Sequence, residues 1–236
     1  MKKFIILFTL IFFALDLSGK SENLQNNSIS RLKNSLPSVV AVRSELMGIK
    51  ETSPPPKGRI NPLVFLAKHR RVVTISRTGA GFFLDETGLI ATNSHIVNKA
   101  KKITVKTFDG KEYEAGIIKI FTEMDLAFIK IDPSPKYTPV KMADSNKVNL
   151  SDTVYTIGSS NFNKGTFIEG KIIGLGRKDT KTELLKTQIE LYKGDSGAPL
   201  LNNKGELIGL LYAKGSGIKN YTLAIPSSKI IDSLKS

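Results

Sequence analysis

Short runs of alternating apolar and polar residues follow one another along most of this chain, and Gly, Pro, Asn or Asp residues separate them. Alternation with a period of two is typical of half-buried strands, and regularly spaced turn signals are typical of β-sandwiches and β-barrels. Residues 132–148 contain three prolines and interrupt the pattern, so they are the best candidate for a linker. The sequence therefore predicts an all-β fold. The clearest runs cover residues 38–42, 71–76, 79–84, 103–108, 116–121, 126–131, 153–157, 166–175, 184–191, 199–201, 207–213 and 221–224.

A serine stands between two glycines in the segment Lys-Gly-Asp-Ser-Gly-Ala-Pro-Leu, which covers residues 193–200. Gly194 and Gly197 allow backbone angles that are closed to other residues, so successive N–H groups can converge beside the Ser196 hydroxyl. A hydroxyl nucleophile next to converging N–H donors is the arrangement that acyl transfer requires. Because serine alone is a weak nucleophile, it also needs a base and a group that orients the base.

The chain has two histidines, so the search for this base is short. His69 lies in the basic run Lys-His-Arg-Arg and is expected to be a solvated surface residue. His95 lies in Ala-Thr-Asn-Ser-His-Ile-Val and is the candidate base. Asp125 directly precedes the apolar run 126–131, where a carboxylate needs a hydrogen-bond donor such as an imidazole N–H. Read alone, an Asp at the start of a strand is more often a turn or cap residue than a catalytic one.

Three segments together resemble the catalytic blocks of trypsin-like serine proteases, and in particular the bacterial HtrA/Deg branch. They are Thr-Asn-Ser-His-Ile-Val at 92–97, Asp-Leu-Ala-Phe-Ile-Lys at 125–130 and Gly-Asp-Ser-Gly-Ala-Pro-Leu at 194–200. Their order of His, Asp and Ser is that of the chymotrypsin fold and differs from the order in subtilisins and α/β-hydrolases. Segments 78–83, 88–92, 156–159 and 223–227 are also HtrA-like, so the resemblance extends from about Pro37 to Leu234.

This resemblance implies two six-stranded antiparallel β-barrels within a protease domain at 37–236. The N-terminal barrel would cover residues 37–140, and the C-terminal barrel with a closing helix would cover 141–236. Residues 228–234 are the expected helix, with Ile230, Ile231 and Leu234 on one face. In many HtrA proteins a PDZ domain follows that helix, and we expect none here because the sequence stops at Ser236.

The resemblance also implies a role for each catalytic residue. His95 would act as general base and acid, Asp125 would orient it, and Ser196 would be the nucleophile. The backbone N–H groups of Gly194 and Ser196 would bind the oxyanion. No cofactor or metal is expected. The chain departs from the family at Ala198, where a second Gly is usual, and at Asp195, where HtrA proteins usually have Asn.

The specificity pocket is a further expectation from the family. In trypsin-like enzymes the residue six before the nucleophile lies at the floor of this pocket, which points to Glu190 and a preference for Lys or Arg. A shift of one position would place Leu191 or Ile189 there instead. HtrA enzymes usually cut after small apolar residues, so both preferences remain open.

The N-terminus predicts export. Lys2 and Lys3 precede an apolar run at 4–15 that is too short to span a bilayer, so residues 1–20 read as a signal peptide with a cut after Gly19. An uncleaved anchor is the alternative. Residues 21–36 read as a flexible leader because their first part is polar and rich in Asn and Ser. The expected location is the periplasm or the outside of a bacterium, and the absence of cysteine excludes disulfides.

A net charge of +14 favours contact with anionic surfaces, so peripheral contact with a cell envelope is possible. The main expectation is a serine endopeptidase that acts on proteins or peptides, in quality control or processing. The alternative is a secreted basic binding protein that uses a protease fold without catalysis. Nucleic-acid binding is not expected, because the chain lacks an aromatic-basic platform. The leader offers no clear counterpart to the N-terminal contacts of HtrA trimers, so a homo-oligomer is possible but not indicated.

Overall fold

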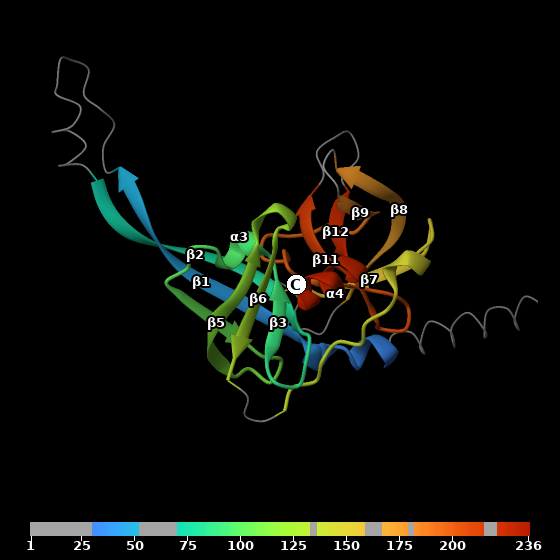
Figure 1. The fold of residues 1–236 in the computed structure, drawn as a ribbon, viewed down its shortest axis with the longest axis horizontal. Helices are drawn as coiled ribbons and strands as arrows, with labels where there is room; N and C mark the ends of the chain where they lie inside the picture. Colours follow the sequence, from blue (N-terminus) through green and yellow to red (C-terminus); the bar gives the residue numbers. More distant parts are fainter. Residues whose placement is uncertain (1–29, 52–69, 133–135, 159–166, 179–181, 215–220) are drawn as a thin grey trace, which may run out of the picture.

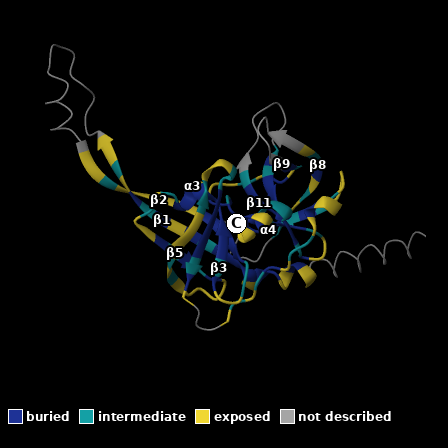
Figure 2. Cartoon of the chain, viewed as in Figure 1, coloured by how far each residue is buried: buried dark blue, intermediate teal, exposed yellow. Residues whose placement is uncertain are grey.

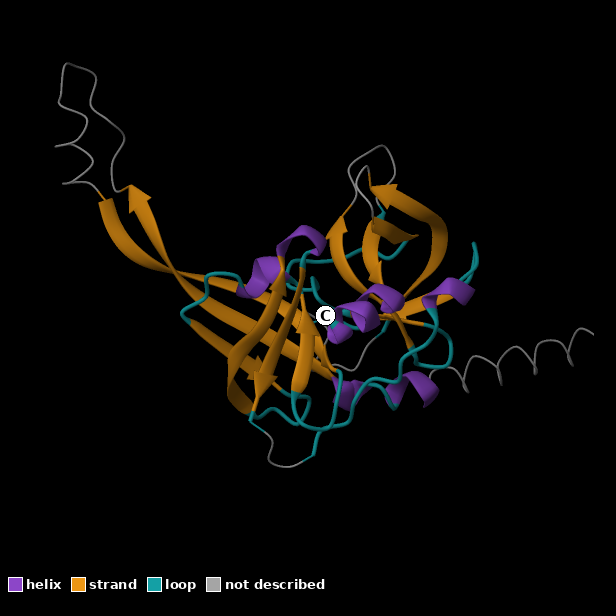
Figure 3. Ribbon diagram, viewed as in Figure 1, coloured by secondary structure: helices purple, strands orange, loops and turns teal. Residues whose placement is uncertain are grey.

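The computed structural model describes residues 30–51, 70–132, 136–158, 167–178, 182–214 and 221–236. Twelve strands in this part of the chain form two closed antiparallel barrels, in the orders β1-β2-β3-β6-β5-β4 and β10-β11-β12-β9-β8-β7 (Figures 1 and 3). The expected all-β fold with two six-stranded barrels is thus confirmed. The first barrel contains β1 (Val39–Glu51), β2 (Arg70–Phe83), β3 (Leu89–Thr92), β4 (Lys102–Lys106), β5 (Glu112–Phe121) and β6 (Leu126–Ile131). The second contains β7 (Thr153–Thr156), β8 (Ile168–Lys178), β9 (Thr182–Thr187), β10 (Pro199–Leu201), β11 (Leu207–Lys214) and β12 (Thr222–Pro226). The remaining elements are η1 (Leu36–Ser38), α3 (Ser94–Val97), η2 (Thr122–Met124), η3 (Ser145–Lys147) and α4 (Ser227–Lys235).

Each barrel has its own apolar interior, and a third apolar cluster joins the two barrels. Val42, Ile90 and Ile129 belong to the first interior, whereas Ile172 and Leu200 belong to the second. Figure 2 shows the buried residues concentrated in the barrels. Burial of a large aliphatic or aromatic side chain contributes about 1.5–3 kcal/mol, so the joining cluster holds the barrels firmly against each other. It contains Phe82, Leu126 and Phe128 of the first barrel, Leu201, Leu210 and Ile225 of the second, and Ile230 of α4.

The longest strands differ from the sequence expectation. Residues 71–76 and 79–84 were expected as separate strands, but β2 runs unbroken and pairs with β1 from Val39↔Phe82 to Glu51↔Arg70. The polar residues at 76–78 do not end the strand because their side chains are exposed. The two strands extend beyond the first barrel as a ribbon (Figure 1). The connection between β1 and β2, residues 52–69, lies outside the described residues.

The ends of the described chain pack on the second barrel. In α4, Ile230 is buried, but Leu234 is 43% exposed, so the expected apolar face is buried only in part. The end of the expected leader is helical at residues 30–33, and Leu32 is buried in the cluster that joins the barrels. The expected signal peptide lies outside the described residues. Within the described part of the chain, no helix has the length and apolar character needed to cross a membrane.

Candidate active site

His95 lies in α3, a single helical turn that directly follows β3. Asn93, the residue before this turn, is buried and extended, and its side-chain N–H donates to the Asp125 carbonyl at 2.9 Å. At the other end of the turn, the Asn98 N–H donates to the Ser94 carbonyl at 2.7 Å. The His95 side chain is 50% exposed, so a substrate can reach its ring.

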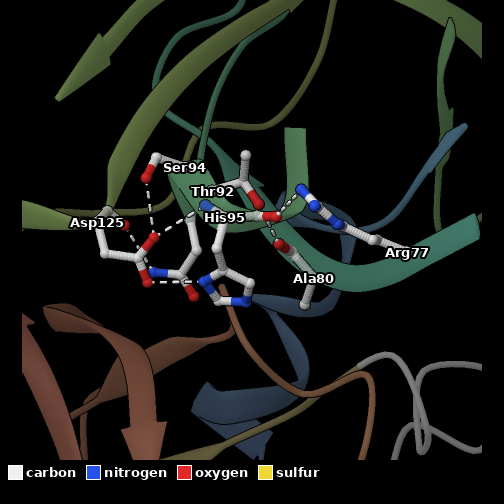
Figure 4. A network of polar contacts seen from close by, with 7 residues as sticks. Arg77, Ala80, Thr92, Ser94, His95 and Asp125 are labelled. Atoms are coloured by element: carbon white, nitrogen blue, oxygen red, sulfur yellow. Dashed lines mark hydrogen bonds and ion pairs between the residues drawn. The ribbon is translucent and has the colours of Figure 1, made fainter. Parts of the chain in front are cut away.

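Asp125 is held beside this turn by a left-handed backbone and several hydrogen bonds. Its φ of 53° closes η2, and Asp is one of the residue types that tolerate this region. Its Oδ1 atom accepts from the Ser94 hydroxyl and from the His95 N–H, both at 2.9 Å. Its Oδ2 atom lies 2.7 Å from Nδ1 of His95 (Figure 4). An ionised carboxylate can only accept, so this contact fixes the proton on Nδ1 and leaves Nε2 as the acceptor of a neutral ring.

A third group positions the His95 backbone from the opposite side. Arg77 on β2 donates from Nη1 to the His95 carbonyl at 2.7 Å (Figure 4). The same Nη1 atom donates to the Asn98 carbonyl at 3.3 Å. Sequence patterns did not indicate Arg77, nor did they indicate the role of the Ser94 hydroxyl. The role of Ser94 could have been suspected from its position next to His95, the candidate base. No sequence signal indicated Arg77, because its hydrogen bond to the His95 carbonyl exists only if β2 continues through residues 76–78.

The serine loop takes the shape that its glycines permit. Gly194 has a φ of 100° and Gly197 a φ of 87°, both in the left-handed region that favours glycine. A Cβ atom on Gly197 would lie 2.1 Å from the Ala80 carbonyl oxygen, so no larger residue fits there without displacing the loop. Ser196 is partly exposed within this loop.

Ala80 on β2 joins the serine loop to the histidine segment. Its N–H donates to the Ser196 carbonyl at 2.7 Å. Its own carbonyl accepts from the Thr92 hydroxyl at 2.7 Å (Figure 4). The neighbouring Gly79 touches both sides as well, because a Cβ there would lie 2.8 Å from the Ser196 carbonyl oxygen and 2.1 Å from Ile96. The two segments, about 100 residues apart, therefore flank the same two residues of β2. Among the described residues no hydrogen bond joins the Ser196 hydroxyl to the His95 ring. Such bonds are often long before substrate binds.

The amide donors of the loop are mostly committed to its own fold. The N–H of Asp195 donates to Tyr192, that of Gly197 to Leu211, and that of Ala198 to the Asp195 carbonyl. The Ser196 N–H has no acceptor among the described residues, so it remains available for an oxyanion. Ala198 is fully buried and does not remove any donor from the loop.

Asp195, at a position where HtrA proteins usually have Asn, is fully buried next to Ser196 in the sequence. Its Oδ2 atom accepts from the Tyr192 N–H at 2.9 Å. Gly158 lies against the same carboxyl group, since a Cβ there would be 2.0 Å from Oδ1. Gly158 therefore packs against the serine loop through the Asp195 side chain, and any side chain at position 158 would displace Asp195.

The expected pocket residues are close in sequence but differ in environment. Ile189 is buried, and its carbonyl accepts from the Thr222 hydroxyl at 2.6 Å, so it belongs to the core. Glu190 is exposed, and Leu191 is half-buried against the interior of the second barrel. His69 lies outside the described residues. Within the described ranges, no three His, Asp or Glu side chains gather in a way that could hold a metal ion.

Several known proteins with similar sequences are peptidases. Residues 79–210 match the family model described as the trypsin-like peptidase domain. A probable periplasmic serine endoprotease, DegP-like, from Rhizobium meliloti is 33% identical over 165 residues, which are 66% of this chain and 33% of that protein. The periplasmic pH-dependent serine endoprotease DegQ of Escherichia coli is 33% identical over 159 residues, covering 64% of this chain and 35% of the relative. The chain thus spans about a third of the length of these relatives.

Solved structures show the same fold. A structure of the HtrA-type protease AlgW with a decapeptide superposes with a TM-score of 0.73 at 24% identity, over 89% of this chain and 65% of the other. A structure of the same protease with a tripeptide has a TM-score of 0.69 at 23% identity, over 89% of this chain and 62% of the other. At this level of identity the likeness concerns the fold.

Proposed function

This chain belongs to the trypsin-like peptidase family, and on that premise we propose that it is an exported serine endopeptidase. It hydrolyses peptide bonds through Ser196, His95 and Asp125. The observation that carries the proposal is the contact of His95 with Asp125. In addition, Ala80 on β2 forms hydrogen bonds both with the serine loop and with Thr92, just before His95. The names of the relatives, which are serine endoproteases, support the same activity.

In the proposed mechanism, Nε2 of His95 takes the Ser196 proton as the hydroxyl attacks a peptide carbonyl. His95 then gives this proton to the leaving amine, and a water repeats the sequence to release the acyl group. Asp125 keeps the ring in the required tautomer and stabilises the imidazolium that forms. The hydrogen bond from the Ser94 hydroxyl to Oδ1 leaves Oδ2 directed at the ring.

We further propose that the N–H groups of Ser196 and Gly194 stabilise the oxyanion. The positive φ values of Gly194 and Gly197 support this assignment, as does the Ser196 N–H, which has no acceptor among the described residues. Loss of one such donor typically costs about 3–4 kcal/mol of transition-state stabilisation.

For the specificity pocket we propose that Leu191 and Glu190 border the site and that small apolar side chains are preferred. The exposed Glu190 carboxylate is solvated, and salt screens its attraction for a substrate cation, whereas the half-buried Leu191 offers an apolar wall. Peptides with Val, Lys or Glu before the cut bond test this. Efficient cleavage after Lys that Glu190→Gln abolishes would contradict it.

Export through the segment at 1–20 and a division into barrels near residue 140 belong to the same proposal. The periplasmic location named for the relatives supports export, and the gap between β6 and β7 supports the division. Quality control or processing of exported proteins is the proposed context.

The activity is tested with a denatured protein as substrate and mass spectrometry of the products. We expect cleavage by the wild-type protein and none by Ser196→Ala or His95→Ala. Equal cleavage by all three would point to a contaminant and overturn the proposal. No cleavage by any of them would favour the alternative of a binding protein on a protease fold.

A further inference from the structure

The strands β1 and β2 continue beyond the first barrel without a third strand. The neighbour on one side, β4, pairs with β1 only from Ala41 to Glu45, and β3 pairs with β2 only from Gly81 to Phe83. Residues 46–51 and 70–75, which we call the outer ribbon, therefore have no further partner strand among the described residues. Figure 1 shows the ribbon leading away from both barrels. A two-stranded hairpin is at best marginally stable in water, so this element is suited to binding something else.

Apolar side chains are exposed on the outer ribbon. Met47 is 55% exposed, Ile49 64% and Val72 65%. Ile49 is the direct cross-strand partner of Val72, and Met47 that of Thr74, so these four side chains share one face. Figure 2 shows the exposed stretches of the ribbon in yellow. Single exposed apolar residues are ordinary, but a contiguous group is typical of an interaction site.

The opposite face of the outer ribbon ends in two cations. Lys50 and Arg71 are direct cross-strand partners, and both are exposed. Like charges in this position destabilise a strand pair, and no described acidic group forms an ion pair with either side chain. An anion that lies against both would relieve their repulsion. The net charge of +14 on the whole chain favours an anionic partner in the same way.

We propose that the outer ribbon docks the protein on a bilayer that contains anionic phospholipid. Met47, Ile49 and Val72 enter the boundary between headgroups and acyl chains, and Lys50 and Arg71 extend their flexible side chains to the lipid phosphates. A second copy of this chain is a poorer occupant, because it would bring two strongly positive molecules and two cationic ribbon ends together. A lipid surface matches the apolar face and the cations at once. This inference is independent of the catalytic proposal.

A local probe on the ribbon tests the idea in the full chain. The chain has no cysteine, so Thr74→Cys provides one labelling site, on the apolar face, for a polarity-sensitive fluorophore. Ile118→Cys, which is also an exposed position and lies on β5, is the matched control. A local readout is needed because the apolar segment at 4–15 can hold the chain on vesicles by itself. Each labelled protein is mixed with vesicles of phosphatidylcholine, with or without phosphatidylglycerol.

With phosphatidylglycerol we expect a blue-shifted emission at position 74, and no shift at 118. Adding Lys50→Gln and Arg71→Gln should raise the lipid concentration needed for half of this shift about thirtyfold. Each basic residue near an anionic surface contributes roughly a fivefold factor to the affinity. Adding Ile49→Thr and Val72→Thr should raise this lipid concentration at least about tenfold, because Thr keeps the preference for strand structure but loses apolar surface. Lys171→Gln, on an exposed position of β8, should change nothing.

Three results would overturn the proposal. The first is an unchanged emission at position 74 with phosphatidylglycerol present. The second is an equal shift at positions 74 and 118, which would mean non-specific adsorption. The third is a shift that appears without lipid as the protein concentration rises, which would assign the ribbon to contacts between copies of the chain.

Discussion

The Nδ1 atom of His95 lies 2.7 Å from the Oδ2 atom of Asp125, although the two residues are 30 positions apart. This contact is one of three that end on the Asp125 carboxylate, and the other two donors, the Ser94 hydroxyl and the His95 N–H, come from the same helical turn. The carboxylate therefore fixes both the ring and the backbone of His95. A half-exposed imidazole with one defined acceptor nitrogen is the result.

Replacing Asp125 by Asn tests the importance of this tautomer. An amide can donate to Nδ1, which would move the ring proton to Nε2, so we expect kcat for a peptide substrate to fall about 10⁴-fold. KM should change little, because Asp125 does not touch the substrate. The thermal midpoint should stay close to that of the wild-type protein. A fall of less than tenfold in kcat would mean that Asp125 does not orient the base.

Removal of the Arg77 guanidinium should affect catalysis through the position of His95. Arg77→Ala loses the hydrogen bonds to the His95 and Asn98 carbonyls, so we expect kcat to fall about fivefold, equivalent to about 1 kcal/mol. Arg71→Ala, an exposed arginine farther along β2, should leave hydrolysis of a soluble peptide unchanged. Equal effects of the two substitutions on kcat would show that the loss reflects charge rather than contact.

Gly197 and Gly110 have similar φ angles, so substitutions at these positions can distinguish the cost of backbone strain from the cost of a steric clash. Gly197 and Gly110 have φ values of 87° and 86°, but a Cβ at 197 would lie 2.1 Å from the Ala80 carbonyl oxygen, and a Cβ at 110 meets nothing within 4 Å. Gly110→Ala should cost only the left-handed strain of about 1–2 kcal/mol in free energy of unfolding. Gly197→Ala should cost more than this and abolish activity. Chemical denaturation and peptide hydrolysis measure both, and an active Gly197→Ala protein would contradict the tight packing.

Asp85 should link the stability of the turn between β2 and β3 to pH. Partial burial raises the pKa of the Asp85 carboxyl, but hydrogen bonds from Leu89 and Thr87 together outweigh it and hold the pKa below its usual value. The stabilisation is therefore present above the unfolded-state pKa of about 3.9 and is lost as the pH falls through the lower folded-state pKa. Asp85→Ala should cost about 0.5–1.5 kcal/mol near neutral pH, because it removes hydrogen bonds whose donors are only partly shielded from water.

Urea denaturation near neutral pH and near pH 3 measures this difference between wild type and Asp85→Ala. The difference should shrink in acid. Asp85→Asn keeps an acceptor oxygen without the charge, so its deficit should be smaller than that of the alanine variant near neutral pH. A difference that grows in acid would reverse the expected sign.

Much of this fold could be predicted from the sequence where local signals agree. The bounds of β6 and β10 match their apolar runs at 126–131 and 199–201, since a turn or a glycine-rich loop precedes each. The continuity of β2 could not be predicted, because its exposed polar stretch at 76–78 resembles a loop and tertiary contacts keep it extended. The number of barrels came from family resemblance, because alternation alone does not distinguish a sandwich from a barrel.

The candidate site divides in the same way. His95 and Ser196 are indicated by their motifs, and the position of Asp125 before an apolar strand indicates a buried carboxylate that needs a donor. Arg77 and the Gly158 support of Asp195 could not be predicted, since each depends on a contact between distant segments. The exposure of Glu190 also follows from the fold alone.

The proposed activity depends on Ser196 as a nucleophile that His95 activates. Labelling with a serine-directed fluorophosphonate, followed by mass spectrometry of the modified peptide, tests it most directly. We expect one adduct on Ser196 in the wild-type protein, a much slower reaction in His95→Ala and none in Ser196→Ala. An unlabelled wild-type protein, or an adduct that persists in Ser196→Ala, would contradict it.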